Sequence, residues 1–99
     1  MEYKLNNDGD SCCLFLSGEI DLHYSPELRK VMLSVYKEDK SLSVDLSEVQ
    51  YLDSSGVACF VEAYQLSKKM KLDFTLINVS EPVMQVIKLA RLDTVFPIK

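Results

Sequence analysis

The chain changes from a strand pattern to a helix pattern at Val49-Gln50-Tyr51-Leu52-Asp53-Ser54-Ser55-Gly56-Val57. An apolar run at 43–46 precedes this stretch and predicts a short β-strand, and apolar residues at helical spacing begin at Val57. The acidic and serine residues 53–55 are common helix-capping types, and Gly56 lets the backbone come close to its neighbours. We therefore expect a strand, a short acidic-serine loop and a helix, in that order.

Two hydroxyl groups, on Ser54 and Ser55, are then expected at the N-terminus of this helix. Unpaired backbone N–H groups and the positive end of the helix dipole favour negative charge there, so a serine in this place tolerates a phosphate. Asp53 and the two serines are equally typical of ordinary capping. Taken alone, the tetrapeptide leaves capping and phosphorylation both open.

Length and composition predict one domain, residues 1–99, in which 47% hydrophobic residues suffice for a single core. The net charge is −4, and Lys and Arg are scattered except at 68–71, so no basic surface for nucleic acid or anionic lipid is expected. The charged start, Met1–Lys4, leads to no signal-peptide core, and no apolar run approaches the roughly 20 residues of a membrane span. We expect a cytoplasmic protein that neither binds nucleic acid directly nor inserts into a membrane.

Few residues are suited to catalysis or metal binding. Cys12, Cys13 and Cys59 form no C-x-x-C motif and have no histidine nearby, so we expect buried or half-buried free thiols, without a disulfide framework or a metal site. His23 is the single histidine, and Ser55 lacks the Gly-x-Ser-x-Gly motif of hydrolases. Three glycines in the whole chain supply no nucleotide-binding loop. A protein that is not an enzyme and needs no cofactor is therefore expected, with a small hydrolase as the less favoured alternative.

The N-terminal part of the chain predicts a hairpin and a helix. Residues 3–5 alternate between apolar and polar, turn residues follow at 6–10, and Cys12–Leu16 is apolar again, which indicates a β-hairpin. After a loop at 22–24, Ser25 is expected to cap a helix. Its inward face has residues at helical spacing, namely Leu28, Val31, Met32 and Val35.

The remaining elements alternate between strand and helix. In order, we expect a strand at 42–46, a helix at 55–70, a strand at 72–78, a helix capped by Ser80, and a terminal strand or extended tail at 94–98. The side chains expected to face the core are Val57, Phe60, Val61 and Tyr64 in the first of these helices and Val83, Val86, Ile87 and Ala90 in the second. Ala58 and Cys59 make the start of the first helix apolar almost all round, which fits either burial on both sides or a docking surface.

This order of elements predicts an α/β fold. Strands that alternate with helices form parallel units with right-handed crossovers, and the N-terminal hairpin adds an antiparallel edge. The expected structure is a small domain with a mixed, mostly parallel sheet and three or more packed helices.

Three motifs stand in a specific order along the chain: Gly18–Asp21 after a strand, Val44–Val49 leading into Asp53–Gly56, and Leu76–Val83. In this order and at these spacings they closely resemble the STAS family, the anti-sigma factor antagonist domains of bacteria. The resemblance extends from about Leu14 to Phe96. It implies the fold expected above and a regulatory, protein-binding function.

The resemblance also implies site residues and partners. The regulated serine of the family matches Ser55, with Ser54 as the second choice, and Asp21 and Asp53 match the neighbouring acidic positions. The partner-binding surface would comprise Asp21, His23, Tyr24, Asp53, Ser54, Gly56 and Val57. The implied partners are an ATP-dependent anti-sigma factor serine kinase, which the domain sequesters when Ser55 is unphosphorylated, and a metal-dependent serine phosphatase. A turn or capping role for the two aspartates stays open beside the functional one.

Two departures from the family pattern keep a second context open. Many members have glycine where Lys68–Lys71 and Arg91 stand here. STAS domains also serve as the cytosolic subunit of phospholipid-transport ABC complexes, where the implied partner is the ATPase subunit. In the sigma-factor context, a phosphate on Ser55 would add about −1.5 to −2 charges and should change binding more than folding.

Overall fold

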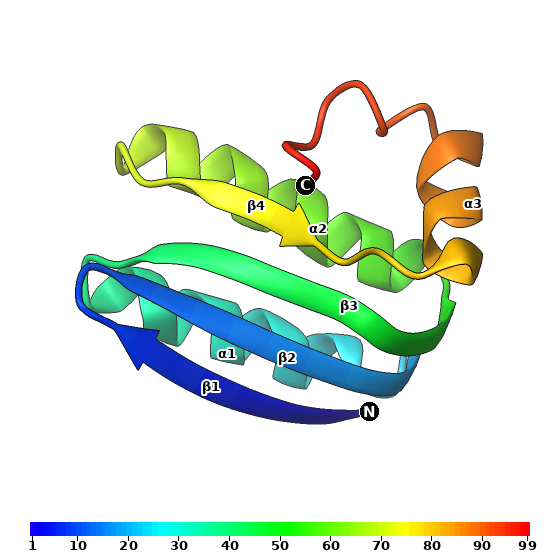
Figure 1. Cartoon of the computed structure of the whole chain (residues 1–99), viewed down its shortest axis with the longest axis horizontal. Helices are drawn as coiled ribbons and strands as arrows, with labels where there is room; N and C mark the ends of the chain where they lie inside the picture. Colours follow the sequence, from blue (N-terminus) through cyan, green and yellow to red (C-terminus); the bar gives the residue numbers. More distant parts are fainter.

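Seven helices and strands make up the computed structural model, which describes residues 1–99. In chain order they are β1 (Glu2–Asp8), β2 (Ser11–Ile20), α1 (Ser25–Lys37), β3 (Ser41–Leu52), α2 (Ser54–Lys69), β4 (Phe74–Ile77) and α3 (Glu81–Leu89). The strands form one sheet in the order β1-β2-β3-β4, in which β1 is antiparallel to β2 and the other pairs are parallel (Figure 1). The predicted fold class and the N-terminal hairpin are therefore confirmed.

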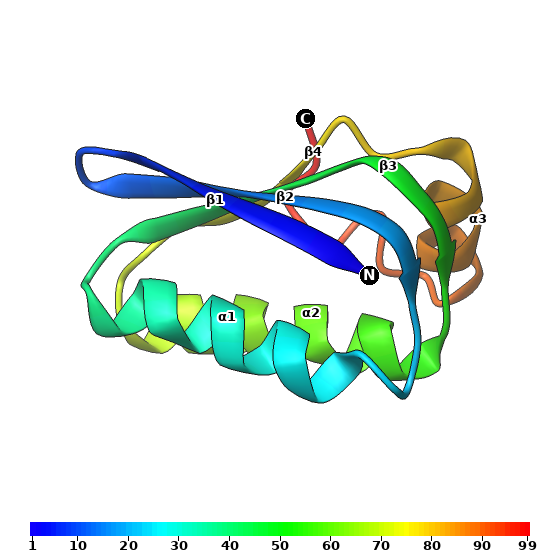
Figure 2. The same cartoon turned by 90° about the horizontal axis from the view of Figure 1, so that it is seen from below.

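Helices α1 and α2 lie together on one face of the sheet, and α3 lies beside the end of β3 (Figure 2). Alternate residues of β2, β3 and β4 point into the core, so that Leu14, Val44 and Leu76 are completely buried. The predicted inward face of α1 is confirmed, since Leu28, Val31, Met32 and Val35 are all buried. No helix has both the length and the apolar character that crossing a membrane requires.

The third strand is much longer than predicted. Its polar second half, 47–52, suggested a loop, but β2 continues to Ile20 and pairs with it from Ser17↔Glu48 to Ile20↔Leu52. The backbone hydrogen bonds of a strand ladder do not depend on side-chain polarity, and the polar side chains of this half face solvent. Two register shifts accommodate the pairing, and at each of them β3 has one residue more than β2. The expected loop thus shrinks to Asp53 alone, between the last residue of β3 and the first of α2.

Two serines that were predicted to cap helices do not cap them through their side chains. Ser25 is the first residue of α1 instead of its cap, and its hydroxyl donates to the carbonyl of Leu22 at 3.3 Å. Ser80 occupies the N-cap position of α3, but its hydroxyl donates to the carbonyl of Val49 at 2.6 Å. In both cases the hydroxyl bonds a carbonyl outside its own helix, and Ser80 thereby joins α3 to β3.

The predicted burial of α2 and α3 is correct in part. Phe60, Val83 and Ile87 are buried as expected, whereas Val57, Val61, Tyr64 and Val86 are partly buried against the core. The most buried face of α2 uses small residues, Gly56, Cys59, Ala63 and Ser67, because it packs closely under the sheet and beside α1. Ala90 is exposed, since α3 ends at Leu89. The C-terminal residues extend the sheet edge through an isolated parallel bridge between Leu76 and Ile98.

Candidate functional site

The candidate site lies where β2 and β3 end side by side. Ile20 and Leu52 are paired as the last residues of these parallel strands, so Asp21 and Asp53 emerge at the same edge of the sheet. The backbone N–H of Asp53 donates to the carbonyl of Ile20 at 3.2 Å, which joins the two strand ends directly. Two acidic residues 32 positions apart in sequence thus begin neighbouring connections to α1 and α2.

Asp53 is the N-cap of α2. Its Oδ1 accepts hydrogen bonds from the backbone N–H of Ser55 at 2.9 Å, the Ser55 hydroxyl at 2.5 Å and the backbone N–H of Gly56 at 3.3 Å. The Ser55 hydroxyl is the largest cause of a lowered pKa of the Asp53 carboxyl, and the two backbone amides add to it. The capping role is therefore present, and the negative charge it requires is stable at neutral pH.

Gly56 is required for the close contact between α2 and the sheet. A Cβ atom at this position would overlap Leu52 Cδ1 and lie 2.8 Å from Ile20 Cγ2. Gly56 is buried, so it cannot contact a partner with a side chain of its own. Its contribution to the predicted partner-binding surface is to let the N-terminus of α2 lie against the two strand ends. Ser55 and Val57, on either side of it, are half-buried, and Ser54 is exposed.

Asp21 organises the loop that faces the helix cap. Its Oδ1 accepts the backbone N–H groups of His23 at 3.0 Å and Tyr24 at 3.2 Å, and its carbonyl accepts the N–H of Ser25 at 2.9 Å. The rings of His23 and Tyr24 meet edge to face with centroids 4.7 Å apart. The predicted turn role of Asp21 is thus seen directly, and this loop and the start of α2 form one continuous end of the molecule.

Leu22 belongs to this end and was not among the predicted residues. Its side chain is 74% exposed between Asp21 and His23. An apolar residue inside a predicted polar loop was the signal that could have identified it.

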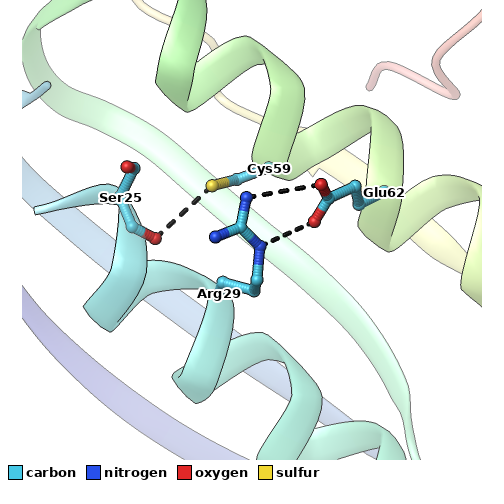
Figure 3. A network of polar contacts seen from close by, with 4 residues as sticks. All are labelled: Ser25, Arg29, Cys59 and Glu62. Atoms are coloured by element: carbon cyan, nitrogen blue, oxygen red, sulfur yellow. Dashed lines mark hydrogen bonds and ion pairs between the residues drawn. The ribbon is translucent and has the colours of Figure 1, made fainter. Parts of the chain in front are cut away.

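Polar contacts between α1 and α2 hold the two helices together behind the site (Figure 3). The buried thiol of Cys59 donates to the carbonyl of Ser25 at 3.4 Å. One turn further, Arg29 and Glu62 form a two-point ion pair, with Nε–Oε2 at 2.7 Å and Nη2–Oε1 at 3.3 Å. Because both helices begin at the site, the buried Cys59 contact ties the start of α1 to α2, whereas the exposed ion pair adds little.

Cys12 and Cys59 are buried and Cys13 is half-buried, as predicted, and all three are free thiols in the structure. The structure contains no group of three or more histidine, cysteine, aspartate or glutamate side chains arranged to hold a metal ion. Of the predicted site residues, the fold brings together the loop residues Asp21, His23 and Tyr24 and the cap residues 53–57.

The site thus consists of a helix cap beside an acidic turn, at one end of a small mixed sheet. The profile of the STAS domain family matches residues 3–99, and the chain belongs to that family.

Relatives and solved structures agree with this assignment. The chain is 32% identical over 94 residues to the anti-sigma-B factor antagonist of Listeria monocytogenes, covering 93% of this chain and 82% of that protein. An anti-sigma factor antagonist from Mycobacterium paratuberculosis superposes with a TM-score of 0.84 at 26% identity, covering 98% of this chain and 83% of the other. The Bacillus cell fate determinant SpoIIAA in its phosphorylated form shares the fold at 17% identity, with a TM-score of 0.78 over 99% of this chain and 91% of that one.

Proposed function

We propose that this domain is a phosphorylation-controlled binding module, which sequesters an anti-sigma factor serine kinase while Ser55 is unphosphorylated and releases it afterwards. The observation that carries the proposal is the position of Ser55. Its hydroxyl lies at the start of α2, held by Asp53, beside the turn formed by Asp21. The names of the similar proteins, anti-sigma factor antagonists, support the class of partner.

Electrostatics at the helix N-terminus explain why a phosphate would act on binding. The Asp53 carboxylate already occupies the amides of Ser55 and Gly56, so a phosphate on Ser55 must point away from them or displace Asp53. It would bring about −1.5 to −2 charges next to an ionised carboxylate. In the free domain, water and salt screen this repulsion, whereas a complex that excludes water strengthens it.

The phosphate must weaken binding strongly, and a site of this kind can supply the necessary change in binding free energy. Changing a complex from about 99% bound to 99% free requires a difference of roughly 5.5 kcal/mol in binding free energy. A buried, unpaired dianion can supply this, and a phosphate at a hydrated rim cannot. The proposal therefore requires that the partner covers Ser55 itself.

The nucleotide chemistry belongs to the partners in this proposal. The kinase supplies ATP and Mg²⁺ for phosphorylation, a serine phosphatase restores the hydroxyl, and the domain acts in the cytoplasm without a cofactor of its own. The negative net charge of −4 gives it no general affinity for nucleic acid.

The test combines site mapping with a binding titration. The purified domain is incubated with the candidate kinase and ATP, the modified residue is mapped by mass spectrometry, and both forms are titrated against the kinase. Ser55→Ala should bind persistently and resist phosphorylation, and Ser55→Asp should bind poorly. Ser54→Ala is the matched control and should be phosphorylated as the wild type is.

Three outcomes would contradict the proposal. Phosphate on Ser54 alone would move the site, and tighter binding of the phosphorylated form would mean that the partner recognises the phosphate. Stable binding to an ABC transporter ATPase, with no phosphorylation by any kinase of the source cell, would favour the transporter context.

A further inference from the structure

Leu22 has an unusual setting for an exposed leucine. With exposed fractions of 74% and 86%, Leu22 and Leu89 are the two most exposed large hydrophobic side chains of the chain. A single exposed leucine needs no explanation in itself. Leu22, however, lies at the strand ends beside the Ser55 site, whereas Leu89 is the last residue of α3.

The backbone around Leu22 is held on both sides. Its carbonyl accepts the Ser25 hydroxyl at 3.3 Å, and the Asp21 carboxylate binds the next two backbone N–H groups. On the other side, the carbonyl of Ile20 accepts the N–H of Asp53. The N–H of Leu22 also faces the Asp53 carboxylate, where it contributes to the lowered pKa of that group.

The Leu22 side chain stands outside the hydrophobic core. The aliphatic side chains that flank it in the sequence, Ile20 and Leu28, are completely buried. The hydrogen-bonded backbone between these two buried residues leaves the leucine in solvent. The exposure of Leu22 therefore follows from the backbone hydrogen bonds of the loop.

We propose that Leu22 is the apolar anchor of the partner surface and inserts into an apolar pocket of the serine kinase. This inference rests on the function proposed above and names a contact residue for it. A loop that is already held loses little backbone conformational entropy on binding, so less of the free energy from burying the leucine is offset. A charge on the neighbouring Ser55 would oppose the dry contact that this insertion needs.

The experiment compares two leucines of similar exposure. Leu22→Ser, Leu89→Ser and Leu22→Met are each titrated with the kinase by calorimetry, using the unphosphorylated domain. Leu22→Ser should weaken binding about 10- to 100-fold, as expected for removing a leucine that the complex buries. Leu89→Ser should stay within about twofold of the wild type, and Leu22→Met should retain most of the affinity. Both serine variants should unfold at the wild-type urea midpoint, because these are exposed positions.

The possible results separate the two proposals. Wild-type affinity in Leu22→Ser, or an equal loss in Leu89→Ser, would overturn the role of Leu22 and leave the Ser55 switch intact. A wild-type domain that binds no such kinase would refute the proposed function, and the anchor role would fall with it. Phosphorylation that releases the wild type, together with weak binding of Leu22→Ser alone, would establish both.

Discussion

The Asp53 carboxylate binds the Ser55 hydroxyl at 2.5 Å and the Ser55 backbone N–H at 2.9 Å through the same oxygen. The residue that we propose for phosphorylation is therefore part of the cap that starts α2. Changes at Asp53 should affect stability and the switch together, whereas changes at Ser54, which takes no part in the cap, should affect neither strongly.

Removing the cap should destabilise the domain. Asp53→Ala deletes the acceptor for two backbone N–H groups, and we expect a loss of about 1–2 kcal/mol in the free energy of unfolding. Asp53→Asn keeps an acceptor oxygen and should lose clearly less. Urea denaturation followed by circular dichroism measures both, and equal midpoints for Asp53→Ala and wild type would show that the cap contributes nothing.

Stability should fall in acid because of two carboxylates. The hydrogen bond from Ser55 lowers the pKa of Asp53; burial raises that of Asp45, but the bonds from Asn78 and Ser47 outweigh it and the net direction is down. A group whose folded pKa is lowered stabilises the fold above its unfolded pKa, near 3.9, and loses this contribution as the pH falls through the folded value.

Urea midpoints should therefore be steady from about pH 7 to 5 and decline below about pH 4. Asp53→Asn cannot be protonated at this position, so its decline should be shallower than that of the wild type. Parallel declines for the two proteins would mean that Asp53 has no lowered pKa.

Gly56 should not tolerate even one additional methyl group. In Gly56→Ala the new Cβ would collide with Leu52 and Ile20, and we expect a cost of about 1–3 kcal/mol, with a larger cost for Gly56→Val. Leu52→Val removes the Cδ1 atom that collides, so the double variant should lose less stability than the sum of the two single variants. Strict additivity in urea denaturation would show that the predicted collision is absent.

Glycine should stabilise two positions that have a left-handed backbone conformation. Lys71 and Arg91 have φ angles of 58° and 59°, a left-handed conformation that costs roughly 1–2 kcal/mol for residues with a side chain. Glycine relieves this strain. It also makes the unfolded chain more flexible, which lowers the free energy of unfolding by about 0.4–1 kcal/mol and offsets part of the gain.

Lys71→Gly and Arg91→Gly should each raise the free energy of unfolding by a few tenths to about 1 kcal/mol. Lys30→Gly, in the exposed middle of α1, is the control and should instead lower it by about 1 kcal/mol. Destabilisation in all three variants would indicate that the lysine and arginine side chains matter more than the backbone strain.

Much of the fold follows from local pattern. The inward face of α1, the hairpin and the alternation of strands with helices depend on residues two to four positions apart, which a sequence displays directly. The length of β3 depends instead on its pairing with β2, about 30 positions away, and this pairing extends into residues whose polarity suggested a loop. Local polarity and backbone pairing are independent, which is why the strand end was misplaced.

The site shows the same division. The sequence by itself identified Asp53, Ser54 and Ser55 as capping residues and, through family resemblance, singled out Ser55 and Asp21. Only the tertiary structure decided that one oxygen of Asp53 holds both the hydroxyl and the amide of Ser55, and that Leu22 stays exposed beside them. Those relationships arise where two parallel strands end side by side, and the side-chain geometry at that edge is set by contacts between distant segments that no local pattern encodes.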